Sequence, residues 1–519
     1  LFLGNNGIVF AWKTFILTVM DRSSNGNGRS DGNGMSALTP STPKKAPGPP
    51  PHQAGADGNC VLFQTSEGAA LRGTIIRLQR NGVVFELYNP MAVLRLSEAL
   101  DDLRIFMQQD EIYSGRAVIN SVVDAGTKLV CEATLDPVNW ADLNLLIALD
   151  NRRGISGEVK RFLEERQKAP PLSPEFKVAV ADLQLFLQDL RLWMDKVELK
   201  VAAQGDAFRP MYERRILETI LPSVLPVLGS FVEKFEKSLP RNAAEMDVSH
   251  AIYARRMLHP LVLCSPFIRR TFEKPLGYAG DYEMVNMMLG EPQAGDSLFA
   301  KLLNVFFLNT SPVVAHRHRI DALTERLKLE VSQHAAFSRP TRIFNLGCGP
   351  AVEVQRFIAS FPFTDDTDFS LLDFNEETIH YTDHTLSKLC RQHDSDCAFR
   401  LTKKSVMLFL KDNSEFKRGH YDFIYCAGLF DYLANSVCEK LIELFYELAA
   451  PGGLVLVSNV NSNNPSRGWM EYVLDWHLIY RNSEELAMLI PERLRSESNV
   501  RAVGDAVNIL VEIRKPDNA

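Results

Sequence analysis

Three small residues, Gly347, Cys348 and Gly349, lie between an apolar run and a stretch of helical periodicity. The apolar run, residues 343–346, predicts a buried strand, and Glu353 falls in the first turn of the predicted helix. A tight glycine turn between a strand and a helix leaves backbone amides that can face a ligand. Asp373 follows the next predicted strand, where a carboxylate can accept both hydroxyls of a ribose. These residues predict an adenosine-binding site.

The same turn disfavours a dinucleotide. Val352 stands where the dinucleotide fingerprint has its third glycine, and Glu353 places an anion where a pyrophosphate has to bind. S-adenosylmethionine carries no phosphate and has a cationic sulfonium and ammonium. The run G-C-G-P-A-V-E resembles motif I of the class I methyltransferases, with Asn345 where these enzymes often have an acidic residue and Ala351 in place of their third glycine. The alternative is an ordinary turn between a core strand and a helix.

The resemblance implies a cofactor site for S-adenosylmethionine and a role for each matching position. The glycine turn is expected to contact the methionine part and Asp373 the ribose, with Glu353 beside them. The remaining expected contacts are Phe374 and Asn375 at the adenine edge, Ser405 and Val406 at its amino side, and Cys426, Ala427 and Gly428 beneath the sulfonium.

Length, composition and charge limit the classes of protein to which this chain can belong. A chain of 519 residues is expected to form about three domains, and 46% hydrophobic with 23% charged residues is typical of soluble globular protein. A net charge of −7 without a long basic run argues against a nucleic-acid partner. The eight cysteines include no C-x-x-C pair, which favours a reduced, cytoplasmic protein without a metal site.

The first twenty residues are apolar but interrupted by Asn5, Asn6 and Lys13, so they predict neither a membrane span nor a cleaved signal. A weak membrane anchor is the alternative. We expect the native start at Met20 or Met35. A disordered segment is expected over 1–56, because residues 21–56 are rich in Ser, Gly, Asn and Pro.

Three domains are expected after this segment. Residues 57–140 alternate short strand patterns with turns, including the hairpin signal Asn81-Gly82, and predict a small antiparallel β-barrel. This order resembles the PilZ domain, a receptor for cyclic di-GMP, although the spacing of Arg72 and Arg77 departs from that family's arginine arm. A degenerate barrel that is structural or docks a partner is therefore favoured over a cyclic di-GMP site. Residues 141–336 predict a helical region, and 337–519 an α/β Rossmann-like methyltransferase domain.

An island within the helical region, residues 272–288, combines glycines with polar and aromatic residues. Tyr278, Asp281 and Tyr282 crowd into one turn, which indicates an active-site loop. The alternative is a helix start with Asp281 as its cap. Further along, His316 and His318 are two residues apart on a predicted helix and share no face, so no metal site is expected.

From Arg214 to the C-terminus the chain resembles the bacterial methyltransferases of extracellular-factor, or 3-hydroxypalmitic acid methyl ester, biosynthesis. The segments that carry this likeness are GYAGDYE and AGLFDYL. The resemblance implies esterification of a 3-hydroxy fatty acid, a small-molecule substrate, giving a quorum-sensing ester. Methyl transfer to a carboxylate needs a dry cavity but no strong base.

Candidate residues for that chemistry come from three segments. Tyr278, Tyr282 and Tyr432 are expected to line the cavity, with Asp281 holding the cofactor's ammonium and Arg317 or Arg319 attracting the substrate carboxylate. A further group, spaced three and four apart on a predicted helix, is interpreted as either an acyl slot or core: Trp469, Tyr472, Trp476 and Tyr480. The apolar stripe of residues 174–199 is interpreted as core, a spacer or a homodimer helix.

Two other functions stay open. The first is methyl transfer to another small molecule or to a protein carboxylate. The second is a non-catalytic signalling module that binds a nucleotide and keeps the methyltransferase fold as a docking relic.

Overall fold

The computed structural model describes residues 59–65, 70–88, 94, 98–107, 110–124, 129–136, 139–140, 160, 172–203, 208–239, 248–334, 339–362, 364–503 and 506–517. The expected disordered segment 1–56, with the start sites Met20 and Met35, lies outside these residues. Every described element belongs to one compact unit, residues 52–519.

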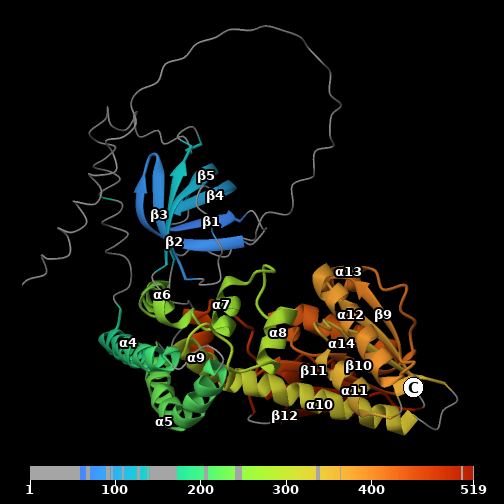
Figure 1. Cartoon of the computed structure of the whole chain (residues 1–519). Coiled ribbons are helices and arrows are strands. Elements are labelled where there is room, and N and C mark those ends of the chain that lie inside the picture. Colours follow the sequence, from blue (N-terminus) through green and yellow to red (C-terminus); the bar gives the residue numbers. More distant parts are fainter. Residues whose placement is uncertain are drawn as a thin grey trace, which may run out of the picture. The chain divides into compact units, whose positions relative to one another are not determined.

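Six antiparallel strands close into a barrel in the order β1-β2-β3-β6-β5-β4 (Figure 1). Along β3 and β6 buried side chains alternate with more exposed ones, because successive residues of a strand point to opposite faces. The expected barrel and its hairpin are confirmed, since Gln79 pairs with Gly82 across a two-residue turn. The strands are β1 (Cys60–Gln64), β2 (Ala70–Gln79), β3 (Gly82–Leu87), β4 (Ala99–Met107), β5 (Asp110–Asp124) and β6 (Leu129–Leu135).

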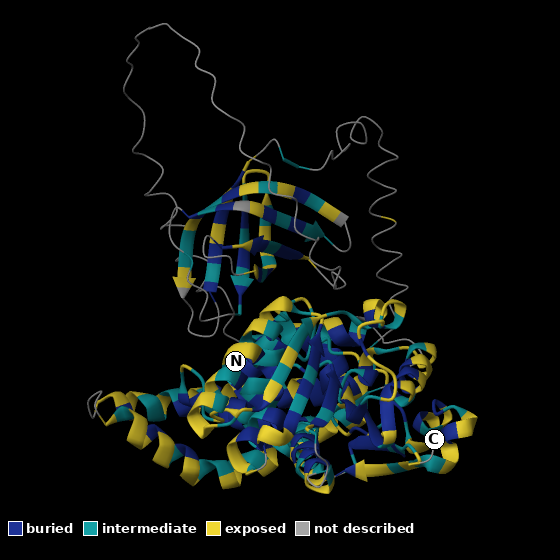
Figure 2. Ribbon diagram, turned by 90° about the vertical axis from the view of Figure 1, so that its right-hand side faces the viewer, coloured by how far each residue is buried: buried dark blue, intermediate teal, exposed yellow. Residues whose placement is uncertain are grey.

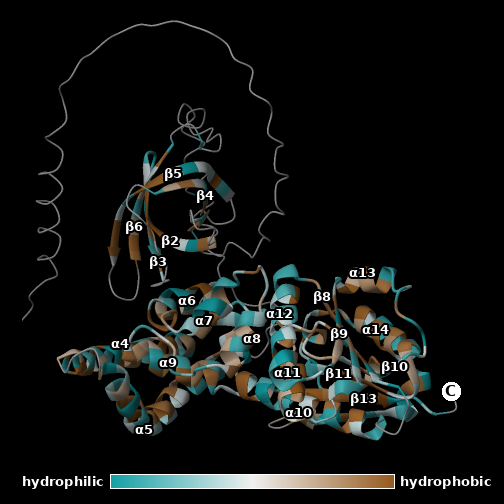
Figure 3. Cartoon of the chain, turned by 45° about the vertical axis from the view of Figure 1, so that its right-hand side comes forward, coloured by the Kyte–Doolittle hydropathy of each residue, from teal (hydrophilic) through white to brown (hydrophobic). Residues whose placement is uncertain are grey.

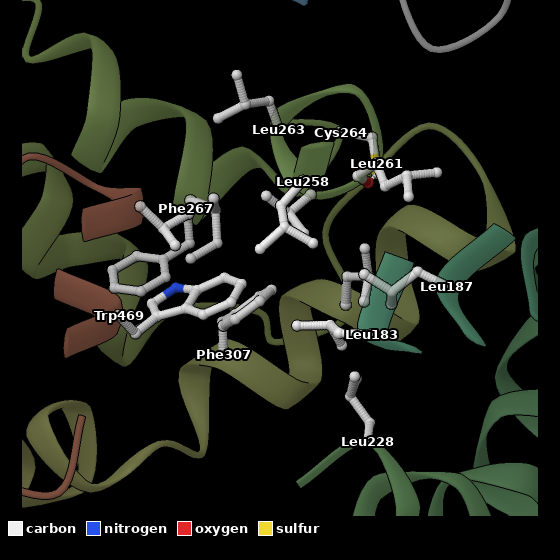
Figure 4. Close-up of a cluster of buried hydrophobic side chains, with 14 of the residues drawn as sticks. Leu183, Leu187, Leu228, Leu258, Leu261, Leu263, Cys264, Phe267, Phe307 and Trp469 are labelled. Atoms are coloured by element: carbon white, nitrogen blue, oxygen red, sulfur yellow. Dashed lines mark hydrogen bonds between the residues drawn. The ribbon is translucent and has the colours of Figure 1, made fainter. Parts of the chain in front are cut away.

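The helical region shares one apolar core, in which Trp469 from the C-terminal part stacks on Phe307 with ring centroids 5.0 Å apart (Figure 4). The two longest helices have a proline in their first two residues, Pro174 and Pro210, where its missing amide costs nothing. The helices are α4 (Pro174–Ala202), α5 (Arg209–Ser238), α6 (Val248–Val262), α7 (Pro266–Glu273), α8 (Tyr282–Leu289), α9 (Leu298–Leu308) and α10 (Ser311–His334).

The C-terminal sheet has seven strands in the order β12-β13-β11-β10-β7-β8-β9. Strands β7 to β11 pair in parallel, whereas β13 pairs antiparallel with β11 and β12. These strands are β7 (Thr341–Leu346), β8 (Thr367–Asp373), β9 (Ala398–Lys403), β10 (Tyr421–Cys426), β11 (Ala449–Val460), β12 (Ser498–Val503) and β13 (Asn508–Arg514).

Helices cover both faces of this sheet, so its central strands are buried (Figure 2) and strongly apolar (Figure 3). One face packs against α10, α11 (Val352–Ser360) and α12 (Glu376–His393). The other packs against α13 (Val406–Lys411), α14 (Asn435–Leu448) and α15 (Ser483–Met488). The strand order reverses between β7 and β10, and the carboxyl ends of strands at such a switch point are where open α/β sheets bind ligands.

The expected aromatic helix face over 469–480 is wrong. Only residues Trp469–Val473 form a turn of π-helix, and an irregular segment follows in which Asp475 has a left-handed backbone, φ 54°. Trp469 and Tyr472 belong to the helical core. The Arg467 guanidinium lies over the Tyr480 ring, 4.6 Å from the ring centroid.

Among the described residues, α5 is the helix that has the length and hydropathy of a membrane span, and 11% of its most apolar window is buried. The bent pair α9 and α10 passes the same test together. One or two such helices are weak evidence for a span. The expectation of no membrane span stays a prediction.

Candidate active site

The glycine turn after β7 is tied to the neighbouring strand. The amides of Gly347 and Cys348 both donate to the carbonyl oxygen of Leu372, at 2.8 and 2.9 Å. Gly347 and Gly349 have φ angles of +76° and +51°, which favour glycine. The expectation that these amides face a ligand is therefore wrong, because β8 already satisfies them. The turn offers no cradle of free amides for a phosphate.

Asp373 lies at the end of β8, beside the glycine turn. Its Oδ2 accepts the amide of Gly349 at 3.1 Å, and its Oδ1 accepts the amide of Asn375 at 2.9 Å. Burial raises the pKa of Asp373, while these amides lower it. The Phe374 amide also lowers the pKa of Asp373, and a carboxylate has about four acceptor positions, so Asp373 can still accept a ligand hydroxyl.

Glu353 projects from the first turn of α11 and is buried. Its Oε1 accepts the Tyr425 hydroxyl at 2.8 Å and the Asn345 amide at 3.3 Å. Burial raises the pKa of Glu353, and the hydrogen bond from Tyr425 works in the opposite direction. A buried carboxylate held in this way can face a cationic group of a ligand.

Residues 277–282 of the island lie over these strand ends, and we call them the roof. The Tyr278 ring contacts the Phe374 ring at a centroid distance of 4.8 Å, and the Tyr282 hydroxyl donates to Glu377 at 2.7 Å. The Tyr432 hydroxyl donates to the carbonyl oxygen of Ala279 at 3.2 Å. Trp476 in turn donates its indole N–H to the Tyr432 hydroxyl at 2.9 Å. The roof is thus fastened to the C-terminal domain at three points.

One cavity of about 390 Å³ runs between the glycine turn, the roof and α10. This volume lies in the usual range for small-molecule sites. Its lining includes the apolar or aromatic residues Val460, Met470, Trp476 and Leu478, and also the polar residues Asp431, Asn464 and Asn508. Twelve of the cofactor- and acceptor-site residues expected from the sequence line it, as does Trp476 of the aromatic group: Tyr278, Tyr282, Arg319, Gly347, Cys348, Gly349, Glu353, Asp373, Phe374, Ala427, Gly428 and Tyr432.

The other expected residues do not line this cavity. Asp281 caps α8 through the Met284 amide and pairs with Arg270 at 2.9 Å, as the alternative interpretation proposed. Arg317 donates to the carbonyl oxygens of Met288 and Leu308. The remaining four are the helix caps Asn375 and Ser405, the helix residue Val406 and the buried strand residue Cys426.

Two further charged residues line the cavity: Arg319, which the sequence offered as the alternative to Arg317, and Asp431, which it did not single out. Arg319, on α10, is 7% exposed, and its guanidinium donates to Nδ1 of His316 at 2.8 Å. Asp431 is 4% exposed, and its Oδ1 accepts the amide of Val460 at 2.6 Å. Burial raises the pKa of Asp431 to about 6, against the lowering effect of Arg319. Sequence spacing gave Arg319 no preference over Arg317, because both follow the same predicted helix start.

No group of three or more His, Cys, Asp or Glu side chains that could hold a metal ion occurs within the described ranges. The expectation that the barrel is a degenerate one without a cyclic di-GMP site stays a prediction; there Arg77 pairs with Glu132 at 3.4 Å.

Comparison with known proteins gives weak likenesses. No family model matches the chain. An uncharacterised protein of Rickettsia prowazekii (strain Madrid E) is 22% identical over 128 residues, which are 25% of this chain and 44% of that protein. The chain thus spans under half the length of this relative.

Among solved structures, a possible exported protein of Bordetella parapertussis is 15% identical, with 57% of this chain and 97% of that one covered and a TM-score of 0.38. Magnesium protoporphyrin IX methyltransferase of Synechocystis PCC 6803 with bound SAH is 10% identical, with 48% and 98% covered and a TM-score of 0.33. Several other matched structures are methyltransferases, at TM-scores from 0.26 to 0.31. At these scores the likenesses carry no weight for function, which has to come from the site.

Proposed function

We propose that this chain is an S-adenosylmethionine-dependent methyltransferase that esterifies the carboxylate of a 3-hydroxy fatty acid. The observation that carries the proposal is one continuous cavity. The same cavity is lined by Asp373, which suits a ribose, by the apolar residues Met470, Trp476 and Leu478, and by a buried cation, Arg319.

The residues present fit this cofactor better than a phosphate-bearing one. The turn amides are already bonded to Leu372, so a pyrophosphate finds no free donors there. Asp373 can accept a ribose hydroxyl, and Glu353 can face the positive end of the methionine part. When bound, S-adenosylmethionine supplies an electrophilic methyl group on a positively charged sulfur.

The chain's own contribution to such a reaction is to exclude water and to position the acceptor. Methyl transfer from a sulfonium to a carboxylate removes two opposite charges, so an apolar, closed compartment favours the transition state. A carboxylate is already ionised at neutral pH, and no side chain has to take a proton from it. The roof, held by its contacts with Phe374, Glu377 and Tyr432, covers part of the cavity.

Asp431 supports a second candidate, methyl transfer to a hydroxyl or amine. A general base works best when its pKa lies near the working pH, and burial brings the pKa of Asp431 to about 6. Such an acceptor has to lose a proton, and Asp431 lines the same cavity.

Incubation with methyl-labelled S-adenosylmethionine and a panel of acceptors tests the proposal. The panel contains 3-hydroxy fatty acids of several chain lengths, the unsubstituted acids, the matching fatty alcohols and amines, and a protein mixture. Label that enters the lipid fraction and is released by mild base identifies a methyl ester. Base-stable label on the alcohols or amines supports the second candidate, and no binding of S-adenosylmethionine at millimolar concentration refutes both.

A further inference from the structure

Arg319 is a buried cation that forms no direct ion pair with any described carboxylate. Within the described part of the chain, no Asp or Glu oxygen lies within ion-pairing distance of its guanidinium, and its one hydrogen bond is to the neutral ring of His316. Burial holds the pKa of His316 well below its usual value, and Arg319 and Arg317 lower it further. A guanidinium has five N–H donors and is always charged. Burying such a cation is costly, and the carboxylates of Asp431 and Glu353, which line the same cavity, act on it from beyond ion-pairing distance.

The surroundings fix where this cation lies. Gly428 follows the end of β10 with φ +87°, and a Cβ there would lie 2.9 Å from Nη2 and 3.2 Å from Nη1 of Arg319. The Gly428 amide is held by Ser458 Oγ at 2.9 Å. The missing side chain at 428 therefore gives the guanidinium its place in the cavity.

We propose that Arg319 binds the carboxylate of the methyl acceptor and that His316 is the positioning residue that orients the Arg319 guanidinium. This inference rests on the proposed function. The planar fork of arginine matches a carboxylate with two parallel hydrogen bonds, and His316 occupies only one donor. Each carboxylate oxygen keeps a second lone pair, so one can attack the methyl carbon. The apolar wall of Met470, Trp476 and Leu478 then takes the acyl chain, and neutral or cationic acceptors are disfavoured.

Equilibrium binding separates acceptor recognition from catalysis. In the presence of S-adenosylhomocysteine, the affinities of a fatty acid and of the neutral fatty amide of equal length are measured by calorimetry for wild type, Arg319→Gln, Arg319→Lys and His316→Asn. We expect wild type to prefer the acid, and Arg319→Gln to lose about 10- to 100-fold in acid affinity with little change for the amide. Arg319→Lys should recover part of the preference, because it restores the charge without the fork. His316→Asn should lie between wild type and Arg319→Gln.

A cofactor role for Arg319 gives a different pattern. S-adenosylhomocysteine carries an amino acid end that methylthioadenosine lacks. If Arg319 binds that end, Arg319→Gln lowers the affinity for S-adenosylhomocysteine to about that for methylthioadenosine and leaves the preference for the fatty acid intact. This result overturns the inference. An unchanged acid preference with unchanged cofactor affinity overturns it as well. If wild type methylates or binds no acid while it binds S-adenosylmethionine, the acyl part of the proposed function fails together with this inference.

A separate observation concerns the outer face of α4. Val178, Leu185, Leu192 and Leu199 are spaced seven residues apart and are 58%, 60%, 68% and 75% exposed. A seven-residue interval keeps side chains in one line along a helix. The opposite side of α4 is buried in the helical core through residues that include Phe176, Leu183, Leu190 and Met194. We call the four exposed residues the α4 stripe.

We infer that a second copy of this chain covers the α4 stripe, with the two helices antiparallel. On one flank of the stripe the exposed charges change sign along the helix, from Glu175, Asp182 and Asp189 to Lys196. A two-fold axis between Leu185 and Leu192 places Asp182 beside the partner's Lys196. It also places Leu185 beside the partner's Leu192. Mixed charges of this kind complement a second copy, whereas a membrane-binding face is expected to be basic.

Sedimentation velocity of the full chain at several concentrations tests this inference. We expect a dimer that Leu185→Glu/Leu192→Glu converts to a monomer, while Met407→Glu, at an equally exposed apolar residue of α13, leaves it intact. Asp182→Lys should weaken the dimer, and the double exchange Asp182→Lys/Lys196→Asp should restore it. A monomeric wild type overturns the inference, and so does a dimer unaffected by the leucine exchanges. Binding of a monomeric wild type to anionic vesicles through the same leucines assigns the stripe to a membrane instead.

Discussion

The Oδ2 atom of Asp373 accepts a hydrogen bond from the backbone amide of Gly349 at 3.1 Å. Two adjacent strand ends are thereby joined at the place expected for a ribose. We predict that Asp373→Ala weakens binding of S-adenosylhomocysteine by about 10- to 100-fold, because a charged acceptor contributes about 1.5 to 3 kcal/mol. Calorimetry measures this change. Asp368→Ala, at the opposite end of the same strand β8, is the control and should bind normally. Equal affinity in the two variants would count against an adenosine pocket.

The two glycines of the roof allow a matched comparison. Gly277 and Gly280 have φ angles of +85° and +84°, so alanine at either position costs about 1 kcal/mol of backbone strain. A Cβ at 277 meets nothing within 4 Å, whereas a Cβ at 280 would lie 3.0 Å from the Tyr432 hydroxyl. We predict similar small decreases in melting temperature for both variants. Only Gly280→Ala should also weaken S-adenosylhomocysteine binding, by about fivefold for one lost hydrogen bond at the roof. Equal affinities would mean that the Tyr432 contact does not close the cavity.

Asp431 separates the two candidate reactions by their pH dependence. If a hydroxyl or amine is the acceptor, Asp431 has to be ionised, so kcat/KM should rise as the pH increases through about 6 and then level off. In that case Asp431→Asn should lower the rate by about 10²- to 10⁴-fold. For a carboxylate acceptor we expect no such rise and a much smaller loss, because no proton is removed. Stopped-time assays with labelled cofactor between pH 5 and 8 measure both quantities.

The sequence was informative where a local pattern decides the structure. Strand alternation predicted the closed barrel, and the glycine turn with Asp373 predicted the corner between β7 and β8, because turn chemistry and strand ends are local. It was misleading at 469–480, where spacing by three and four suggested one helix face. The left-handed Asp475 ends the turn early there, and contacts with the distant α6 and α7 hold that conformation.

The hydrogen-bond and ion-pair partners of individual side chains also could not be predicted from sequence patterns. Arg317 and Arg319 stand two apart on α10, yet one donates to helix carbonyl oxygens and the other enters the cavity. The difference depends on Gly428, more than a hundred residues later, which leaves the space that Arg319 fills. Asp281 likewise pairs with Arg270 and caps its own helix, a pairing that only the packing of α7 beside α8 creates.

Asp475 should stabilise the wall of the cavity through its charge. Its carboxylate pairs with Arg255 at 2.9 Å and Lys274 at 3.3 Å, and Lys274 also donates to its carbonyl oxygen at 2.5 Å. Burial alone would raise the pKa of Asp475, but His477, Arg255 and Lys274 prevail and lower it. A pKa below the unfolded value of 3.8 means that the contribution is present at neutral pH and is lost as the pH falls below about 4.

We therefore predict that Asp475→Asn destabilises the protein by about 3 kcal/mol at pH 7, because it leaves two partly buried cations without their partner. Asparagine accepts the left-handed backbone at this position, so the exchange removes the charge and not the conformation. Scanning calorimetry at pH 7 and pH 3.5 should show a large decrease in melting temperature at the first pH and a smaller one at the second. Asp383→Asn, at an exposed position of α12, should change neither. A decrease that is equal at both pH values would mean that geometry, and not the Asp475 charge, holds residues 469–475 against α6 and α7.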